Sequence, residues 1–592
     1  MTSSTGEKLA FVTSVFPNKV RIEVVNLTAF KANIDDALGD LKIGSYLEIS
    51  DNDGCRLIAI IESYQIELKE RIIENEQGGK EKEIYNAYVL EASPLGTIKD
   101  GKFIRGGDAL TIPPTEVRPA NAADIKLIYE TGFDVAEKFC FAKLSQDENI
   151  CVPVNGNKFF NKHFAVVGSS GSGKSHTIAK ILQNTIDIEK GTRAFDLNNS
   201  HIIIFDIHNE YKTAFPDANF LNVENLILPY WLLNSEELEE LFLDTEANDH
   251  NQRNIFKEAI INEKISNVVK MENEDATEFE KRKQKIHYDS PVLFDIGKVL
   301  EIANNKNDEM IDTGEVYASG AKKGQPKMNQ GSLFGKLTNF VSRLENKVND
   351  KRFDFLLGDN SKAVSFEDTI KQFVGYNKRK KKNESGEEVE IDKSNVTIID
   401  LSGVPFEVLS ITVSLISRIL FDYGYFYKKY LNDGVDLETP LLLVYEEAHK
   451  YVPKSDSEKF KASRNAIERI AKEGRKYGVT LGIVSQRPSE ISETIFSQCN
   501  NFIAMRLTNP SDQNYVRRLL PDTLGNLIEA LPSLQSGEGL LLGEAVAMPS
   551  LVKIDKCEAD KQPSSNDVKY LEIWKDEWKD VNFENIIAEW KK

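Results

Sequence analysis

Residues 163–180 constrain the fold of this chain more than any other segment. They read HFAVVGSSGSGKSHTIAK, and residues 168–175 match the pattern G-x-x-x-x-G-K-[ST] completely. An apolar run precedes the motif and a helical pattern follows it, which is the context in which this motif works. The glycines let backbone N–H groups turn inward around phosphate oxygens, and the following helix N-terminus adds positive potential. The sequence therefore predicts a strand, a phosphate-binding loop and a helix.

Each residue type in this loop has an expected part in binding a nucleoside triphosphate. We expect Lys174 to reach the β- and γ-phosphates and the Ser175 hydroxyl to bind Mg²⁺. The expected ligands are therefore ATP and Mg²⁺. The candidate nucleotide-binding residues are Gly168, Ser169, Gly171, Ser172, Gly173, Lys174, Ser175 and His176.

Short apolar runs recur after residue 160 and predict a mostly parallel β-sheet. They read FAVVG, IIIFD, VTIID, LLLVY, LGIVS and FIAMRL, and helical patterns lie between them. Fully apolar strands that alternate with helices indicate a sheet covered on both faces, which is an α/β fold. Ligands of such sheets bind at the carboxyl ends of the strands.

Changes of pattern divide the chain into five parts. Residues 1–145 alternate apolar and polar residues between turn signals, which predicts a small N-terminal β-barrel. Residues 146–225 and 393–556 carry the apolar runs and are expected to be the two parts of the ATPase core. Residues 226–392 show helical spacing and predict an inserted helical subdomain, whose charged loops are expected to be solvated rather than DNA-binding. Residues 557–592 are expected to be a linker, EADKQPSSND, and a tail.

The tail holds three of the four tryptophans of the chain, Trp574, Trp578 and Trp590. Trp574 and Trp578 are four residues apart and are expected to share a helix face. Two interpretations remain open, docking onto the ATPase core or binding of a partner, because aromatic residues are enriched at interface anchors.

Composition favours a cytoplasmic protein. The chain has 74 lysines and arginines against 93 acidic residues, a net charge of −19, which argues against a general DNA-coating protein but not against a local basic channel. It has no run of about 18 uninterrupted apolar residues, so no membrane span is expected, and no secretory signal is visible. Five scattered cysteines without a CxxC pair fit a reducing compartment and argue against structural zinc.

Two strand ends carry the candidate hydrolytic residues. In PLLLVYEEAHKYVP, Glu446 and Glu447 follow a buried strand and should face the phosphates. One acid is expected to hold the Mg²⁺ shell, partly through water, and the next to polarise the attacking water. Glu446 is the metal-side candidate and Glu447 the base. In LGIVSQRPSEI, Gln486 ends a strand and is either a sensor of the γ-phosphate or an ordinary strand-end amide.

Further polar residues surround these strands. IIIFDIHNEYKTAF places Asp206, His208 and Glu210 beside the loop, and His208 is either a packed residue or a functional one. The helix of residues 457–478 places Arg464 and Arg475 on one arc with acidic and basic neighbours. Such an arginine either stabilises γ-phosphate charge across a subunit boundary or belongs to a solvated, ion-paired face.

The ordered motifs resemble those of HerA-type ATPases in the FtsK–HerA superfamily of P-loop DNA pumps. The matching segments are GSSGSGKS, FDIHNEY, LPYWLLNSEEL, IIDLSGVP, VYEEAHKYVP, EGRKYGV and SQRPSEI, and the match spans roughly residues 1–556. The resemblance implies a RecA-like core, a cytoplasmic homo-hexamer around double-stranded DNA, and movement of that DNA by ATP hydrolysis.

The resemblance also implies roles for single residues. Lys174 and Ser175 correspond to the nucleotide clamp, Glu446 and Glu447 to the hydrolytic acids, and Gln486 to the sensor. Arg475 is the best candidate for an arginine finger acting in the neighbouring subunit. Relatives often carry an Arg-His pair before the first strand, where this chain has residues 162–163, Lys-His, and lysine lacks the bidentate fork of arginine.

By the same resemblance, the partner is a separate effector protein. The family works with nucleases of the NurA type or, in phage-defence operons, with sirtuin-type NAD-consuming enzymes. We therefore expect an ATP-driven DNA translocase or helicase in phage defence or DNA-end processing. The alternative is an ATP-gated hexameric scaffold that activates its effector with little translocation. A metabolic P-loop kinase is disfavoured by the large insert and the paired acids.

Overall fold

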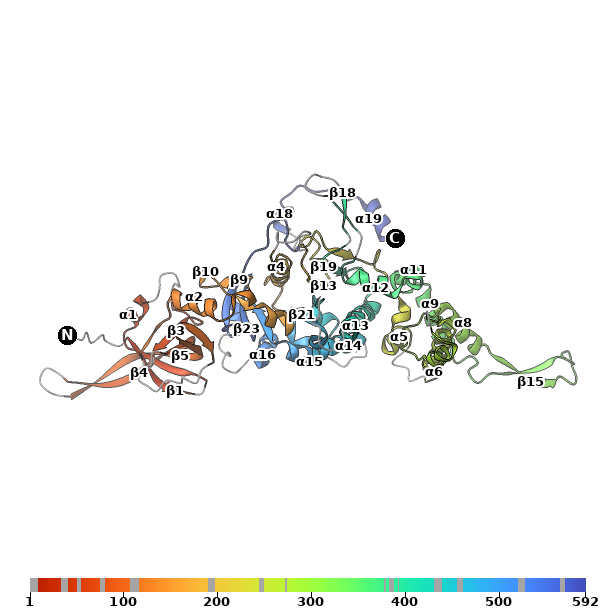
Figure 1. Cartoon of the computed structure of the whole chain (residues 1–592), viewed down its shortest axis with the longest axis horizontal. Coiled ribbons are helices and arrows are strands. Elements are labelled where there is room, and N and C mark those ends of the chain that lie inside the picture. The colour runs from red at the N-terminus through yellow and green to blue at the C-terminus, as the bar shows by residue number, and fades with distance from the viewer. Residues whose placement is uncertain are drawn as a thin grey trace.

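The structure is a computed structural model of the whole chain, and Figure 1 shows an elongated molecule with three parts in a row. A β-rich part with the N-terminus lies at one end, an α/β part in the middle and a helical part at the other end. The structure describes residues 9–16, 18–33, 41–50, 55–74, 80–106, 116–189, 197–243, 250–271, 274–376, 379–382, 388–391, 393–430, 439–454, 461–519, 528–564 and 570–591.

The N-terminal part is an antiparallel sheet of seven strands. A bridge between Phe11 and Glu116 brings the two edges of this sheet together. Some of its apolar side chains form a core of their own. The others pack into the core of the rest of the molecule: Tyr46, Ile58, Ile60, Leu95, Ile98 and Phe103. The strands follow the order β1 (Ala10–Val15), β2 (Val20–Val24), β5 (Lys80–Lys99), β4 (Arg56–Glu74), β3 (Tyr46–Ser50) and β7 (Val117–Pro119), with β6 (Lys102–Arg105) paired to β5.

The middle part is built on an eleven-stranded sheet. Every apolar run predicted to be a core strand is a strand of this sheet. Seven neighbouring strands are parallel: β22 (Asn501–Met505), β12 (Phe164–Val167), β21 (Val479–Ser485), β20 (Leu441–Tyr445), β13 (His201–Asp206), β19 (Val396–Asp400) and β14 (Asn219–Leu221). Four antiparallel strands continue the sheet beyond β22: β23 (Glu538–Gly543), β24 (Ser550–Ile554), β9 (Ala142–Leu144) and β10 (Asp147–Cys151).

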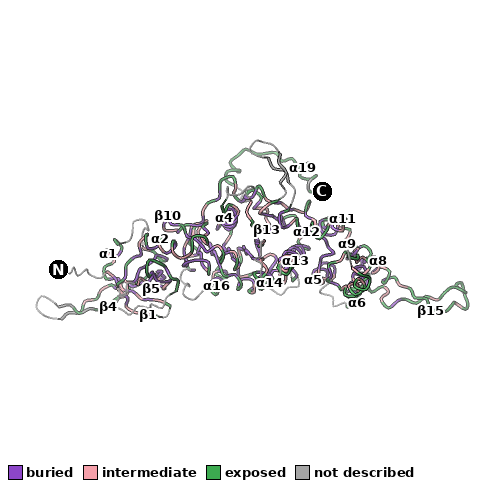
Figure 2. The backbone as a smooth tube through the Cα atoms, in the orientation of Figure 1, coloured by how far each residue is buried: buried purple, intermediate pink, exposed green. Residues whose placement is uncertain are grey.

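Apart from His201 of β13 and Phe220 of β14, every residue of the parallel strands is buried. Figure 2 shows the burial concentrated in this middle part. Among the helices, α4 (Lys174–Ile186) follows the first core strand, and α13 (Phe406–Tyr430) packs against α14 (Lys461–Glu473). Among the described residues, no helix is both long and apolar enough to cross a membrane. The chain enters the central sheet at β9, slightly before residue 145.

The insertion is mainly helical. Its helices are α5 (Ser235–Phe242), α6 (His250–Asn267), α7 (Ala276–Gln284), α8 (Ile296–Asn307), α9 (Thr338–Val348), α10 (Asp354–Leu357), α11 (Asp359–Ala363) and α12 (Phe366–Phe373). A hairpin of β15 (Met310–Val316) and β16 (Pro326–Gln330) projects from it (Figure 1), and β17 (Arg379–Lys382) pairs with β18 (Glu388–Ile391). The charged loop expected at residues 377–390 thus contains paired strands.

The C-terminal segment differs from the sequence expectation in two respects, the linker and the helix expected to carry Trp574 and Trp578. Residues 557–564 are ordered against the core rather than forming a free linker, while the rest of the expected linker, residues 565–567, lies outside the described residues. Trp574 and Trp578 do not share a helix, because α18 (Tyr570–Ile573) ends before both. Asn582 caps a new helix, α19 (Phe583–Trp590), through the Asn585 N–H.

Candidate active site

The phosphate-binding loop joins β12 to α4, as its sequence predicts. Gly171 and Gly173 have φ angles of 70° and 103°, in the left-handed region where a side chain is strained. The loop is held from outside: Ser169 N donates to Arg506 O at 2.7 Å, and Gly537 N donates to Ser172 O at 2.9 Å. Its curled backbone is therefore fixed by contacts with the residue after β22 and the residue before β23.

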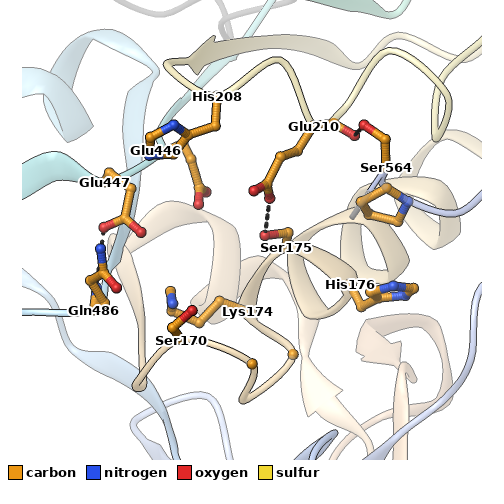
Figure 3. Close-up of a pocket in the computed structure, with 13 residues that line it drawn as sticks. Ser170, Lys174, Ser175, His176, His208, Glu210, Glu446, Glu447, Gln486 and Ser564 are labelled. Carbon is orange, nitrogen blue, oxygen red and sulfur yellow. Dashed lines mark hydrogen bonds between the residues drawn. The ribbon is translucent and has the colours of Figure 1, made fainter. Parts of the chain in front are cut away.

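A cavity of about 320 Å³ lies over this loop (Figure 3). Its walls come from segments that are far apart in the sequence and meet at the carboxyl ends of the parallel strands, as expected for this fold. It is lined by Ser170, Gly171, Gly173, Lys174, Ser175, His176, His208, Glu210, Glu446, Glu447, Gln486, Pro563 and Ser564. Gly168, Ser169 and Ser172 belong to the loop but are not among these lining residues.

Lys174 and Ser175 point into the cavity from the first turn of α4. The Lys174 ammonium lies 3.4 Å from the Ser169 carbonyl, so it is positioned within the loop that would hold phosphates. Ser175 Oγ donates to Glu210 Oε2 at 2.6 Å. The sequence places Glu210 beside the loop but assigns it no role. In the structure it is hydrogen-bonded to Ser175, the expected metal ligand.

Glu446 is the more deeply buried of the paired acids. Tyr211 Oη donates to its Oε2 at 2.8 Å, and Tyr451 Oη donates to its backbone carbonyl. Burial, together with the charge of Glu447, raises the pKa of Glu446 to about 8. Without a cation beside it, this carboxyl favours its protonated form near neutral pH.

Glu447 has the opposite electrostatic character. Burial by itself raises the pKa of Glu447, but the hydrogen bond with His449 and the Lys174 charge outweigh burial and hold the pKa below its ordinary value. His449 Nδ1 lies 3.2 Å from Glu447 Oε2 and 3.1 Å from Ser485 Oγ. The backbone of Glu447 has a φ of 47°, a left-handed conformation that is uncommon for a residue with a side chain and is often found at functional sites.

Gln486 and Glu447 meet on the same side of the cavity. The Gln486 N–H donates to Glu447 Oε2 at 3.4 Å, and the Gln486 side chain lines the cavity. Glu446 and Glu447, which directly follow β20, have pKa values shifted in opposite directions, and such a divergence is the usual mark of separate acid and base roles.

Asp206 and Arg475, which lie outside the phosphate-binding loop, do not line the cavity either. Asp206 is buried and accepts hydrogen bonds from the N–H groups of His208 and Tyr211, so it shapes the turn after β13. Arg475 is exposed in a short 3₁₀ turn (Gly474–Tyr477) after α14 and is not among the lining residues. Sequence reasoning missed Tyr211, His449, Pro563 and Ser564, although Tyr211 and His449 lie within motifs that it used.

The donor set fits Mg²⁺ and a nucleoside triphosphate. Ser175, Glu210, Glu446 and Glu447 supply oxygen atoms, which Mg²⁺ prefers, and Mg²⁺ sites in such proteins combine few protein oxygens with substrate phosphates. Lys174 supplies a positive charge beside the loop, whose backbone N–H groups suit phosphate oxygens.

Comparison with known proteins shows that the chain is similar to HerA helicases. Residues 139–420 match the family model of the helicase HerA central domain. A probable helicase of Methanocaldococcus jannaschii is 25% identical over 587 residues, which cover 95% of this chain and 96% of the relative. The DNA double-strand break repair helicase HerA of Saccharolobus solfataricus is 27% identical over 485 residues, covering 81% and 79% of the two chains.

Among solved structures, VirB4 of Thermoanaerobacter pseudethanolicus aligns with a TM-score of 0.46 and 13% identity, covering 73% of this chain and 100% of that one. The phosphate-binding loop, Glu210 and Tyr211 lie inside the region matched by the family model. With Glu446, Glu447 and Gln486 assembled over that loop, the chain is a P-loop ATPase whose central domain is of the HerA type.

Proposed function

We propose that this protein is an ATP-driven translocase or helicase that works as a hexameric ring around double-stranded DNA and serves a separate effector protein. The observation that carries the proposal is the arrangement of Glu447 and Gln486 opposite Lys174 and Ser175 in a HerA-type ATPase. The relative from Saccharolobus solfataricus, whose name describes a DNA double-strand break repair helicase, supports DNA as the substrate.

The residues divide the work of hydrolysis between them. Lys174 draws the β- and γ-phosphates into the loop and offsets their charge. Glu447, held ionised by His449 and Lys174, accepts a proton from the attacking water. Gln486, beside Glu447, contacts the same water or the γ-phosphate. Ser175 and Glu446 would hold Mg²⁺, which would supply positive charge against the negative charge of the phosphates.

The lining of the cavity supplies little positive charge from this chain. Among the described residues that line it, Lys174 is the only lysine or arginine. Phosphoryl transfer in such ATPases commonly uses a further arginine on the γ-phosphate. Arg475 is exposed on the surface of the same domain, away from its own cavity, and is available to a neighbour. This division supports a ring in which each subunit completes the next site.

The exposed tail supports a partner protein. Every tail residue from 570 to 591 whose side chain is described is exposed, including Trp574, Trp578 and Trp590. Exposed aromatic side chains of this size are frequent anchors of protein interfaces. We propose that the partner is an effector, a nuclease or a sirtuin-type NAD-consuming enzyme, and that the role is phage defence or DNA-end processing.

A comparison of wild type with Glu447→Gln tests the proposal against the scaffold alternative. The motor hypothesis expects DNA-stimulated ATP hydrolysis and displacement of a triplex-forming strand in wild type, and neither in the variant. Effector activation that survives in Glu447→Gln rings would favour the ATP-gated scaffold. Absence of DNA stimulation in assembled wild-type rings would rule out the motor.

A further inference from the structure

Residues 557–564, here called the strap, lie along the nucleotide cavity. Cys557 and Pro563 are buried, and Pro563 and Ser564 line the cavity together with the phosphate-binding loop. The strap reaches this position although nearly four hundred residues separate it from the loop in the sequence. Its polar and charged sequence, CEADKQPS, is typical of a linker, and the structure instead makes it one wall of the site.

Hydrogen bonds attach the strap to α4 and to the turn after β13. Gln183 Nε2 donates to Lys561 O at 2.8 Å, and Thr213 Oγ1 donates to Gln562 O at 2.6 Å. Ser564 N donates to Glu210 O at 2.8 Å. Glu210 therefore holds the Ser175 hydroxyl with its side chain and the strap with its backbone.

The orientation of a bound nucleotide follows from the chemistry of the cavity. The γ-phosphate must lie near Glu447 and Gln486, where hydrolysis takes place. The base and the ribose must then leave the loop in the opposite direction. Figure 3 shows Glu447 and Gln486 on one side of the cavity and His176 and Ser564 on the other. The strap thus lies where the nucleoside half belongs.

We propose that Pro563 and Ser564 bind the nucleoside half of ATP, so that the strap is a part of the nucleotide site. The pyrrolidine ring of Pro563 offers an apolar surface for the ribose or the base. Ser564 Oγ donates its proton toward the carbonyls of Asn209 and Glu210, at 3.2 Å and 3.3 Å. A hydroxyl that donates in this way keeps lone pairs that can accept a hydrogen bond from a ribose hydroxyl.

The proposal deepens the ATPase site and rests on the assignment of that site. It is tested by measuring binding of ATP and of inorganic tripolyphosphate, each with Mg²⁺, to the full-length protein by calorimetry. Tripolyphosphate occupies only the phosphate half of the site. The variant Pro563→Ala/Ser564→Ala loses the proline ring and one hydrogen bond to the ligand. Its Kd for ATP should rise about tenfold, which corresponds to a loss of roughly 1.4 kcal/mol of binding free energy. Tripolyphosphate binding should stay within about twofold.

Lys561→Ala is the matched control, since its side chain pairs with Glu558 in the strap and does not line the cavity. It should change neither affinity. If the double variant retains the full wild-type preference for ATP over tripolyphosphate, the proposal is wrong. It is equally wrong if wild type binds both ligands with the same affinity. If wild type binds neither, the assignment of the nucleotide site itself fails.

A second measurement on wild type covers the case in which the double variant does not fold. Photolabelling with 8-azido-ATP places the reactive group on the base. The labelled peptide should contain residues 557–564, and excess ATP should suppress the label while tripolyphosphate suppresses it only at higher concentration. ATP-protected labelling confined to other peptides would overturn the proposal.

Discussion

Ser175 and Glu210 are hydrogen-bonded across the nucleotide cavity, with Ser175 Oγ donating to Glu210 Oε2 at 2.6 Å. The serine comes from the first turn of α4 and the glutamate from the turn after β13. The hydroxyl expected to bind Mg²⁺ is therefore oriented by a carboxylate. Partners of metal ligands that act in this way commonly affect metal affinity about 10–100-fold.

Replacement of Glu210 should change the requirement for Mg²⁺. In Glu210→Ala, the Ser175 hydroxyl loses its acceptor and the site loses a negative charge. We expect the Mg²⁺ concentration that gives half-maximal ATPase activity to rise about tenfold. A Mg²⁺ titration at fixed ATP measures it. Glu224→Ala, on an exposed surface outside the cavity, should behave as wild type; an unchanged titration in Glu210→Ala would contradict the role.

Lys174→Ala should abolish hydrolysis and leave the fold intact. The ammonium has one weak hydrogen bond, to Ser169 O, so its loss removes a contact with the phosphates but little packing. We expect at least about a hundredfold loss of ATPase activity, roughly 2.7 kcal/mol of barrier. Circular dichroism should show an unchanged melting curve. Lys180→Ala, on the same helix but outside the cavity, is the control, and activity of Lys174→Ala within twofold of wild type would refute the site.

The core could be predicted from the sequence because its signals are local. Each parallel strand is an uninterrupted apolar run, and the glycines at 171 and 173 mark a backbone that only they adopt without strain. Glu446, Glu447 and Gln486 could be assigned to the site because they directly follow such strands. The hairpin of β15 and β16 was missed, since every residue of β15 is exposed and alternation of burial is absent.

The strap could not be predicted for a different reason. Its position depends on hydrogen bonds from Gln183 and Thr213, side chains that nothing in the strap sequence indicates. The opposite pKa shifts of Glu446 and Glu447 were hidden in the same way. They result from burial of Glu446 beside the charge of Glu447, and from His449 and Lys174 next to Glu447. Adjacent acids in a sequence look alike until their neighbours are known.

His163 should make folding stability depend on pH. Burial lowers the pKa of His163 to about 4, whereas an unfolded histidine titrates near 6.5. Between these values the unfolded chain binds the extra proton, so the free energy of unfolding falls as pH decreases from 6.5 to 4. The contribution lost is at most about 3 kcal/mol. It is fully retained above pH 6.5.

Urea unfolding at several pH values between 4 and 7 measures this contribution. His163→Asn tolerates the left-handed backbone at this position, where φ is 47°, and removes the titrating group. The variant should be less stable than wild type at pH 7, and the difference should shrink as the pH decreases. The exposed His250 gives the control His250→Asn. A stability difference for His163→Asn that stays constant across this range would contradict the prediction.

Deletion of residues 565–592 should leave the ATPase intact and remove the effector. The tail side chains that the structure describes are exposed, and the strap, which lines the nucleotide cavity, is retained in this deletion. Co-purification with the effector from the native host should be lost, while the mass by light scattering and the ATPase rate stay unchanged. The full-length variant with Trp574, Trp578 and Trp590 changed to alanine should reproduce the loss. If the shortened protein falls to monomers, the tail is structural and the partner assignment is wrong.

Arg475 should act on the ATP held by a neighbouring subunit. It is exposed beyond the end of α14 and does not line the cavity formed by Lys174 and Glu447 of its own chain. An arginine finger contributes a factor of about 10³–10⁵ to the rate in well-studied phosphoryl-transfer enzymes. Rings made only of Arg475→Ala or only of Glu447→Ala should therefore be almost inactive.

Mixing these variants distinguishes an arginine that acts across subunits from one that acts within its own. In mixed rings, some interfaces pair an intact Arg475 from the Glu447→Ala subunit with an intact Glu447 from the Arg475→Ala subunit. ATPase activity should then recover in part, and the recovery should depend on the mixing ratio. Cross-linking each ring before mixing should prevent it, because subunits no longer exchange. If fluorescence demonstrates subunit exchange and ATPase activity does not return, Arg475 is not the residue that acts across subunits. The same mixing experiment with alanine variants of Arg464 and then Arg469 would identify which arginine of α14 takes that place.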